Sequence, residues 1–597
     1  MEGLVEGLSG RLFLEDSLSV DLLPLATLAA LDSTPVTSGI GSHLRLVLDA
    51  VRAIYGDGEA ILRPEYPERC VKAARHHPWC GRVLAFAMHQ RAALKLEQQQ
   101  DSEGAIAAYT LAIDLPGAAI DQVARGRVNR GTTRMEAHDV EGAIDDFTSA
   151  IGLDAPADLL ARALVGRAQA KGESGDSAGE MADLDAATAV PGTSAWWRAW
   201  CLFHRGFAKR KRLDAGAAIA DFTAAIELPG TGPEIVAPSL AERGIMRDAR
   251  GDSAGAMDDY TRAVALADAP ASAVALALIR RGLGHGAAGR LQAAVVDFTA
   301  AIELPGADPT QVGSALVFRG GLRSALGLDG SIADFTSAIE LPGTAGEDVA
   351  RALVFRGRMR SANGDVGGAM DDFTRAIELP EGEDQQATAR VNRGNLRLLS
   401  PTLQLQDIEA AIEDFTVAIE RPDTEPDSVV TALIGRATAL SALGEMERAI
   451  DDCGTAIALP GIPADRAADV FATRGRLKEL LGDDAGAAAD YGAVIEMEGA
   501  GAGVAVQALM GRAAVRGRGG DREGAMADLT GVIGLAGAAA EDVAHALLDR
   551  GLLKGQGGDL PGEIGDYATA AEVPEAPEAV LEDARGRLRE ALRRDVA

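Results

Sequence analysis

The chain has 597 residues, which is too long for one hydrophobic core but suits an array that grows along one axis. Apolar residues make up 47% and aromatic residues only 4%, so small side chains predominate, as in closely packed helices. The formal net charge of -31 opposes binding to phosphate backbones, which argues against a general nucleic-acid-binding role and favours neutral or basic partners.

The N-terminal sequence predicts no secretion signal, because its first ten residues carry acidic side chains where a signal peptide needs basic ones. No apolar run approaches the roughly 20 residues of a membrane span. Four cysteines in a chain of this length do not form a disulfide framework. We therefore expect a soluble, cytoplasmic protein that makes no contact with membranes.

Residues 1–84 do not follow the pattern of the rest of the chain. Apolar stretches at Leu22–Leu31 and Leu44–Tyr55 predict helices, and Pro64–Pro67 predicts a break. This helical N-terminal segment fits a cap, a degenerate pair of repeats or a small partner-binding region. The sequence does not choose between these three.

Cysteine and histidine side chains gather near the end of this segment. Zinc accepts both ligand types, but their spacing matches no zinc motif. Packed side chains are therefore the favoured interpretation, and we expect no metal and no other cofactor. The residues concerned are Cys70, His76, His77 and Cys80.

Residues 85–575 are built from one repeated motif. The segments 218–230, 331–343 and 369–381 are near copies, with the sequences AIADFTAAIELPG, SIADFTSAIELPG and AMDDFTRAIELPE. Thirteen copies follow one another, and nine of the twelve intervals between them are 38 residues. Repetition at this period predicts stacked units, each of which is stable only beside its neighbours.

Each unit is predicted to be a pair of helices. Ala369, Phe373 and Ala376 occupy one face of a helix at spacings of i, i+4 and i+7. Another helix precedes it over residues 349–362, and a turn containing Gly364 joins the two. A proline after the motif ends the second helix. The Phe373 slot holds a bulky residue in most units, and its small neighbours let the adjacent helix approach closely.

These features resemble the tetratricopeptide repeat (TPR) family. The match consists of a glycine in the first helix, then alanine, an aromatic residue and alanine in the second helix, and a proline after it, and it covers more than four-fifths of the chain. The resemblance implies an all-α fold, an α-solenoid superhelix of about thirteen helix pairs whose first helices line a concave groove. The period exceeds the family's ~34 residues by about one helical turn, which predicts a longer first helix or a longer connection.

An arginine in the first helix and an aspartate in the second recur in twelve consecutive units, and ten of these pairs are 16 residues apart. We name them the Arg–Asp ladder. Residues so placed can meet across the turn in a two-point ion pair. A salt bridge that fixes helix register is the favoured interpretation, and a row of ligand-binding arginines is the alternative. The pairs are Arg130 and Asp146, Arg167 and Asp183, Arg205 and Asp221, Arg243 and Asp259, Arg281 and Asp297, Arg319 and Asp334, Arg356 and Asp372, Arg393 and Asp414, Arg436 and Asp452, Arg474 and Asp490, Arg512 and Asp528, and Arg550 and Asp566.

The repeat departs furthest from its pattern at Ser194–Leu213, where three of the four tryptophans and four consecutive basic residues fall. Aromatic anchors beside basic residues are typical of peptide-binding hot spots. The alternative is that the rings fill space beside a unit whose aromatic slot holds only Leu184, while the bases pair with nearby acids. The family resemblance implies that Trp200, Phe203, Phe207, Arg210 and Lys211 face the groove. The predicted partner-binding residues are these five with Trp196 and Trp197.

A second irregularity is the turn at residues 400–407, which lengthens one interval to 42 residues. Partner contact and tolerated surface growth both remain open for this turn.

Residues 576–597 predict a C-terminal capping helix. Its apolar stripe is expected to consist of Leu581, Ala584, Leu588 and Leu592, with charged residues on the other face.

The sequence carries no motif that predicts catalysis, since it has neither a phosphate-binding loop nor a metalloprotease helix. The G-x-S-x-G string of a nucleophile elbow occurs around Ser177 and Ser253, but each copy falls at a turn between two helices.

We therefore expect a non-enzymatic scaffold or adaptor that binds a partner protein or peptide in the groove. One alternative is a regulatory or inhibitory subunit that sequesters an effector, such as a protease or transcription regulator, in a bacterial signalling, stress or defence system. Another is an enzyme whose activity lies in residues 1–84.

Overall fold

The computed structural model describes residues 59–76, 81–400, 402–422 and 424–596, and all regular secondary structure in these ranges is helical. The all-α fold class is thus confirmed. The chain divides into two compact units, Met1–Ala307 and Asp308–Ala597. This division falls inside the predicted repeat array. The helices expected before residue 59 lie outside the described residues.

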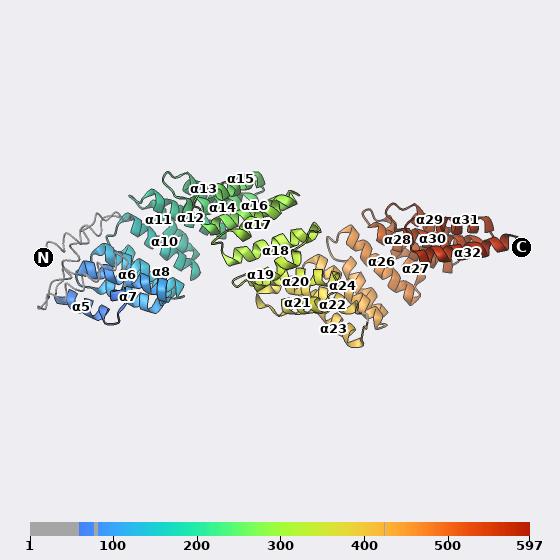
Figure 1. Ribbon diagram of the computed structural model, residues 1–597, viewed down its shortest axis with the longest axis horizontal. Helices are drawn as coiled ribbons and strands as arrows, with labels where there is room; N and C mark the ends of the chain where they lie inside the picture. The colour runs from blue at the N-terminus through green and yellow to red at the C-terminus, as the bar shows by residue number, and fades with distance from the viewer. Residues whose placement is uncertain (1–58, 77–80, 401, 423, 597) are drawn as a thin grey trace. The chain divides into compact units, whose positions relative to one another are not determined.

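Over its described residues, the first unit has two short helices and then six consecutive helix pairs, each a first helix followed by a second (Figure 1). These elements are α4 (Glu59–Leu62), α5 (Tyr66–His76), α6 (Gly81–Gln99), α7 (Ser102–Asp114), α8 (Ile120–Glu136), α9 (Val140–Ile151), α10 (Ala157–Glu173), α11 (Ser177–Ala189), α12 (Ala195–Lys211), α13 (Ala215–Glu227), α14 (Pro233–Ala249), α15 (Ser253–Ala265), α16 (Ala271–Ala287) and α17 (Leu291–Glu303).

The second unit contains seven further pairs and a last single helix (Figure 1). These elements are α18 (Pro309–Ala325), α19 (Ser331–Glu340), α20 (Gly346–Ala362), α21 (Val366–Glu378), the 3₁₀ helix η2 (Pro380–Gly382), α22 (Glu383–Leu398), α23 (Leu405–Glu420), α24 (Pro426–Ala442), α25 (Met446–Ile457), α26 (Ala464–Leu481), α27 (Asp484–Glu496), α28 (Ala502–Arg518), α29 (Arg522–Gly534), α30 (Ala540–Gln556), α31 (Leu560–Ala570) and α32 (Glu578–Val596).

The 38-residue period divides in the same way in most pairs, as α12 and α13 illustrate. The first helix has 17 residues and the second has 13. A short turn joins them, and a connector that begins with the Leu-Pro sequence leads to the next pair. An aspartate begins most second helices, and its carboxylate accepts a hydrogen bond from a backbone N–H three residues on, as Asp214 does from Ala217. The residue before the aspartate has a positive φ, as Leu213 does at 60° and Gly251 at 82°, so these two positions together fix the turn.

A glycine lies under the aromatic ring in nine of the pairs, where the two helices approach most closely. A Cβ atom at any of these glycines would lie only 2.5–2.9 Å from the ring, so no larger residue fits without movement. The nine contacts join Gly131 and Phe147, Gly206 and Phe222, Gly244 and Tyr260, Gly282 and Phe298, Gly320 and Phe335, Gly357 and Phe373, Gly394 and Phe415, Gly475 and Tyr491, and Gly551 and Tyr567.

Where the second helix lacks an aromatic ring, the glycine is replaced by alanine in every pair that carries the ladder. Each alanine packs against a side chain smaller than an aromatic ring. Its methyl group on the first helix occupies the volume that the smaller side chain on the second helix leaves free. The three pairs are Ala168 with Leu184, Ala437 with Cys453, and Ala513 with Leu529, and all six residues are buried.

The structure joins all twelve pairs of the Arg–Asp ladder. The arginine donates from Nε to one carboxylate oxygen at 2.8–3.1 Å and from Nη2 to the other at 2.5–2.7 Å. The pair links the first and second helices of one unit. In several units the arginine also donates from Nη1 to a threonine of the preceding second helix, as Arg356 does to Thr336 at 3.0 Å.

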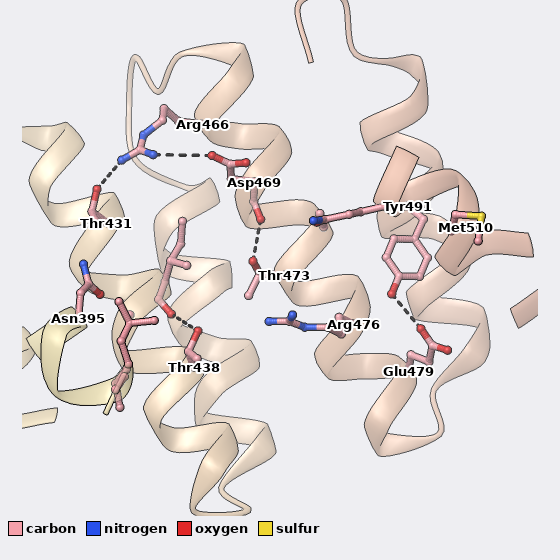
Figure 2. A pocket seen from close by; sticks show the side chains of 16 residues that line it. Asn395, Thr431, Thr438, Arg466, Asp469, Thr473, Arg476, Glu479, Tyr491 and Met510 are labelled. Carbon is pink, nitrogen blue, oxygen red and sulfur yellow. Dashed lines mark hydrogen bonds and ion pairs between the residues drawn. The ribbon is translucent and has the colours of Figure 1, made fainter. Parts of the chain in front are cut away.

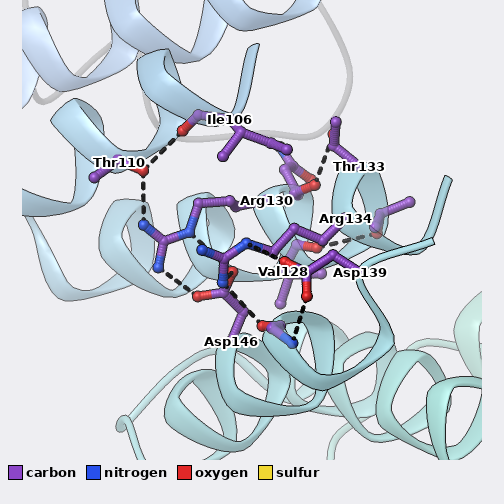
Figure 3. A network of polar contacts seen from close by, with 11 residues as sticks. Ile106, Thr110, Val128, Arg130, Thr133, Arg134, Asp139 and Asp146 are labelled. Atoms are coloured by element: carbon purple, nitrogen blue, oxygen red, sulfur yellow. Dashed lines mark hydrogen bonds and ion pairs between the residues drawn. The ribbon is translucent and has the colours of Figure 1, made fainter. Parts of the chain in front are cut away.

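A second cation joins most ladder aspartates, four residues after the arginine. In Figure 3, Arg130 and Arg134 both reach Asp146, and Arg134 contacts it at 2.8 Å. Lysine serves the same role elsewhere, as Lys209 does at 2.7 Å from Asp221. Sequence inspection missed this contact because the position alternates between arginine and lysine. It holds histidine in one unit and Leu440 in another.

These contacts change how the aspartates titrate. Burial opposes ionisation of Asp566, but hydrogen bonds from Arg550 and Lys554 outweigh it and lower the pKa of this carboxyl group. A lowered pKa in the folded state contributes stability above the pKa of an unfolded aspartate, about 3.9. That stability is lost as the pH falls through the folded value.

The last helix, α32, packs against α31 as the predicted cap, but with a different apolar face. Val580, Ala584 and Ala591 are buried, whereas Leu592 is 44% exposed and Leu581 is only half-buried. The predicted stripe is therefore wrong at Leu592. Both sets of residues satisfy helical spacing, and the contact with the preceding helix selects the narrower side chains because they allow closer approach.

The break predicted at Pro64–Pro67 is shorter in the structure. α4 ends at Leu62 and α5 already begins at Tyr66, so Pro67 lies in the first helical turn, where its missing N–H costs little. Cys70 is fully buried in a cluster with Tyr66 and Met88. His77 and Cys80 lie outside the described residues.

Replacing Gly357 by alanine tests the close approach of the helices. Alanine normally stabilises a helix interior by about 1 kcal/mol relative to glycine, but here its Cβ would lie 2.7 Å from the Phe373 ring. We expect Gly357→Ala to lower the free energy of unfolding by about 1–3 kcal/mol, measured by urea denaturation of the whole chain.

Adding Phe373→Leu to that variant recreates the Ala–Leu pairing seen at Ala168 and Leu184 and should recover part of the loss. The control is Gly367→Ala in α21, where a Cβ meets open space. A double variant less stable than Gly357→Ala would contradict the proposed complementarity.

Removing a ladder aspartate tests the ion pairs. The side chains of Arg356 and Asp372 are 6% and 1% exposed, and Arg360 also contacts this aspartate at 2.9 Å. Asp372→Ala leaves two cations without their partner, so we expect a loss of about 3 kcal/mol, seen as a lower urea midpoint.

The matched comparison is Asp452→Ala, because within the described part of the chain Asp452 forms an ion pair with Arg436 alone and Leu440 fills the position of the second cation. This variant should lose less. Replacing both Arg356 and Asp372 by apolar residues of similar volume should also cost less than Asp372→Ala. If Asp372→Ala unfolds at the parent midpoint, the ladder does not stabilise the pairs.

Candidate partner-binding surface

The ladder gives the twelve first helices that carry it a common register, because its arginine points toward the second helix of its own pair. Positions on other first helices can be compared by their distance from that arginine along the chain. A residue that lies two positions after it, for example, occupies the same face of each first helix.

A groove of about 880 Å³ runs across four consecutive first helices of the second unit, α22, α24, α26 and α28 (Figure 2). Its lining mixes hydroxyl, amide, charged and apolar side chains, among them Asn395, Thr438, Arg476, Gln507 and Met510. The prediction of partner-binding residues did not include this groove. It lacks a cluster of aromatic residues, and its residue types are common in the chain. Its lining residues can be related to one another only when the first helices are aligned on their ladder arginines.

The lining residues recur at fixed positions relative to the ladder arginines. Thr431, Ile434 and Thr438 lie five before, two before and two after Arg436, and Asp469, Ala472 and Arg476 lie at the same three positions from Arg474. At the end of α22, Leu398 and the following residue Leu399 add the positions five and six after Arg393. We call these the groove positions.

In α12 the groove positions hold the aromatic and basic residues singled out by the sequence. Counted from Arg205, they are Trp200, Phe203, Phe207, Arg210 and Lys211. Trp197 and His204 also match lining positions, those of Arg466 and Thr473 in α26. Every groove position of this helix is therefore aromatic or basic.

The rings of α12 form a continuous row. Trp197 lies edge-on between Trp196 and Trp200, with ring centroids 4.7 and 5.3 Å away. Trp200 then meets His204 at 4.1 Å, and His204 meets Phe203 at 5.4 Å. Such edge-to-face contacts hold aromatic rings in fixed orientations.

Part of this row also serves packing. Trp196, Trp200 and Phe203 contact the cluster formed by Ala199, Ala225 and Ile235. Trp200 further contacts the cluster that contains Leu184. None of the aromatic rings is fully buried. The rings thus fill space beside the smaller unit and still present a surface.

The four basic residues that follow have different environments. Lys209 belongs to the ladder through Asp221, and Arg212 donates to the backbone carbonyl of Ser177. Arg210 and Lys211 lie over the ring of Phe207, at 4.4 and 5.3 Å from its centroid. Two of the four are therefore placed beside a groove-position ring.

Two buried titratable groups adjoin this surface. Glu242 on α14 lies 3.3 Å from Nε of Arg210, and burial raises the pKa of its carboxyl group even though Arg210 opposes the shift. Burial lowers the pKa of His204 to about 4, so its imidazole is neutral near pH 7. The surface therefore carries its positive charge on Arg210 and Lys211.

The other candidate sites of the sequence show no catalytic or metal geometry in the described part of the chain. Ser177 and Ser253 are the first residues of α11 and α15 and are exposed. No group of three or more potential metal ligands gathers among the residues that the structure describes. Over the same residues, no helix is both long and apolar enough for a bilayer crossing.

Solved structures resemble the chain in fold. Yeast Tom70 is 16% identical over 86% of this chain and 96% of its own, with a TM-score of 0.34. A tetratricopeptide repeat protein from Parabacteroides merdae is 18% identical over 53% of this chain and 97% of its own, with a TM-score of 0.32. The human IFIT1 dimer with m7Gppp-AAAA is 13% identical over 73% of this chain and 94% of its own, with a TM-score of 0.37.

The thirteen helix pairs, their in-phase motif and the glycine–aromatic contacts decide the architecture. The chain has a TPR-like α-solenoid fold. No protein-family model matches the sequence, and no curated protein matches it. At these low identities and TM-scores, the solved structures give no information about the binding partners of this chain.

Proposed function

We propose that this protein is a non-enzymatic interaction scaffold whose first helices bind segments of partner proteins. The groove across α22, α24, α26 and α28 is the observation that carries the proposal, because it is open, elongated and lined by residues that change from pair to pair. A repeated backbone with variable groove positions supports recognition of an extended segment.

The aromatic and basic surface of α12 is proposed as a partner-binding hot spot in the first unit. Its residues are Trp196, Trp197, Trp200, Phe203, Phe207, Arg210 and Lys211. Large rings held in place by their neighbours lose little conformational freedom on binding, and cations beside them add directional contacts. A partner segment with apolar and acidic side chains fits this chemistry.

A protein partner fits the charge of the chain better than a nucleic acid does. The net charge of -31 repels phosphate backbones, and the ladder arginines are neutralised by their aspartates.

A cytoplasmic location is part of the proposal. Burial raises the pKa of Cys201 and of Cys453 to about 12, so both thiols stay protonated and chemically quiet.

Partner recovery from the native host tests this proposal. Tagged wild-type chain and the variant Trp200→Ala with Phe207→Ala are compared for the proteins that copurify. We expect the variant to lose at least one specific partner by about tenfold or more, because truncated hot-spot rings cost at least 2 kcal/mol each.

The control is Leu213→Ala, at a residue that is 92% exposed just after α12. Melting curves show whether the variant still folds, since Trp200 also packs inside the unit. Equal recovery of every partner by a folded variant would show that this surface is not the hot spot. A single stable partner whose own activity falls on binding would assign the protein to regulation instead of scaffolding.

A further inference from the structure

The apolar side chains that the second unit leaves exposed gather along one edge. Of its ten exposed leucine and valine side chains among the described residues, eight lie at or next to a turn that joins a first helix to its second helix. These turns share one edge, because residues at equal distances from the ladder arginines line one groove, which requires parallel first helices. The eight are Leu326, Leu328, Val366, Leu399, Leu403, Leu405, Leu480 and Leu481.

The start of α23 projects beyond its neighbours at this edge. α23 begins at Leu405, six residues before Ala411, whereas α21 and α25 begin three residues before the matching residues Ala369 and Ala449. The three added residues lengthen α23 by roughly 4.5 Å. The extension carries Leu405, and Leu403 lies just before it.

Hydrogen bonds hold this projecting turn in one shape. The backbone N–H of Gln404 donates to a carboxylate oxygen of Asp407 at 3.0 Å, and the side-chain amide of Gln404 donates to the carbonyl of Thr402 at the same distance. Ile408 is buried, which anchors the first turn of α23, while Leu405 is 60% exposed. A surface fixed in this way loses little conformational freedom when a partner binds.

The turn between α26 and α27 presents a second group of leucines on the same edge. Leu480 and Leu481 end α26 and are 64% and 48% exposed. The intervening turn, which joins α24 to α25, contributes the half-buried Leu443 and Met446. Exposed apolar side chains that gather in this way mark an interaction surface. The leucine edge, as we call it, consists of Leu403, Leu405, Leu480 and Leu481.

The charged residues beside the leucine edge are mostly acidic. Glu409 and Glu447 occupy the same position near the start of α23 and α25, and Asp483 caps α27. All three are exposed and form no ion pair among the described residues. Arg448 is the one basic residue within 399–410, 442–449 and 480–487, and it forms an ion pair with Glu445. A ligand of this edge therefore meets negative charge around the leucines.

This charge distinguishes between the candidate occupants of the edge. A second copy of the chain would bring the same acidic residues, and residues 1–58 also carry more acidic than basic side chains. An anionic lipid surface would be repelled as well. A partner segment with apolar and basic side chains offers both apolar contact and opposite charge.

The spacing of the two leucine groups suits a helix. The groups belong to pairs that are two apart, and since neighbouring helices pack roughly 10 Å apart, the groups are separated by roughly 20 Å. A helix covers this distance in about 13 residues. An amphipathic helix presents apolar side chains every three or four residues and charged side chains beside them.

We propose that the leucine edge binds a basic amphipathic helix of a partner protein. The apolar stripe of the helix packs on the two leucine groups, and its lysine or arginine side chains approach Glu409, Glu447 and Asp483. This surface lies at the turns and not on the groove side of the first helices. It therefore goes beyond the proposed scaffold function and adds a second kind of partner.

The test measures fluorescence anisotropy of the full-length chain with a labelled synthetic peptide of about fourteen residues. The striped probe has leucine at every third or fourth position and lysine or glutamine elsewhere, and the scrambled probe has the same composition without the stripe. We expect the striped probe to bind at least about tenfold more tightly than the scrambled probe. Leu405→Gln with Leu480→Gln should weaken binding of the striped probe by about tenfold or more, because two apolar contacts are lost.

Two further variants support this comparison. Leu403→Gln with Leu481→Gln changes the other members of the leucine edge and should weaken the striped probe in the same direction. The matched control is Leu213→Gln with Leu552→Gln, at two exposed leucines away from this edge, and its affinity should equal that of the wild type. Urea midpoints equal to that of the wild type show that each variant is folded.

Glu447→Gln with Asp483→Asn tests the charge. Asparagine still caps α27, so this variant keeps its fold. We expect it to bind the striped probe about threefold more weakly at low salt and to show a smaller loss of affinity as salt is added.

Equal affinity for the striped and scrambled probes would overturn the inference, as would unchanged binding by both leucine-edge variants. Self-association of the wild type that disappears in these variants, measured by light scattering, would also overturn it and assign the edge to a contact between copies. Trp200→Ala with Phe207→Ala should bind the striped probe as the wild type does. A failure here is therefore distinguishable from a failure of the partner-recovery test on α12.

Discussion

The Arg–Asp ion pair inside each helix pair is the constraint on which the rest of this structure depends. By joining Nε and Nη2 of the arginine to both oxygens of the aspartate, it fixes the rotation of the first helix against the second. Because twelve pairs share it, they also share one assignment of faces. The side of each first helix that faces its second helix is used for packing. The residues on the opposite side can differ from pair to pair and are available for contacts with a partner.

The glycine–aromatic contact works together with the ladder, one residue further along the first helix. In α20, Arg356 reaches the aspartate while Gly357 admits the ring beside it. Both contacts need the same small separation between the helices, because a Cβ at the glycine would push the arginine away from its partner. Among the twelve pairs that carry the ladder, alanine takes the place of this glycine only where Leu184, Cys453 or Leu529 has replaced the ring.

Much of the fold could be predicted from the sequence because the same residue types recur at constant spacing. The helix pairs, the proline stop and the ladder partners follow from this regularity, as with Arg243 and Asp259. The second cation was missed because arginine, lysine and histidine alternate at its position. The apolar stripe of α32 could not be chosen from spacing alone, since Leu592 and Ala591 both fit a helical period and only the contact with α31 distinguishes them.

The two candidate surfaces differed in how visible they were to sequence analysis. The rings of α12 stand out by composition, so Trp200 and Phe207 could be singled out before any geometry was known. Arg476 and Asn395 belong to residue types that are common throughout the chain. Whether such residues line the groove depends on their position relative to the ladder arginine. Whether their charges are already paired cannot be read from the sequence.

The ladder also decides where this acidic chain presents positive charge. Most of its arginines near the helix interface are neutralised by a buried aspartate, so they contribute little to the field outside the pair. Arg476, an exposed arginine at a groove position, has no such partner among the described residues and acts over a short range, where screening by salt is weakest. The positive charge on the groove side of the first helices therefore comes from the few cations left unpaired there, while the net charge of -31 repels acidic molecules at longer range.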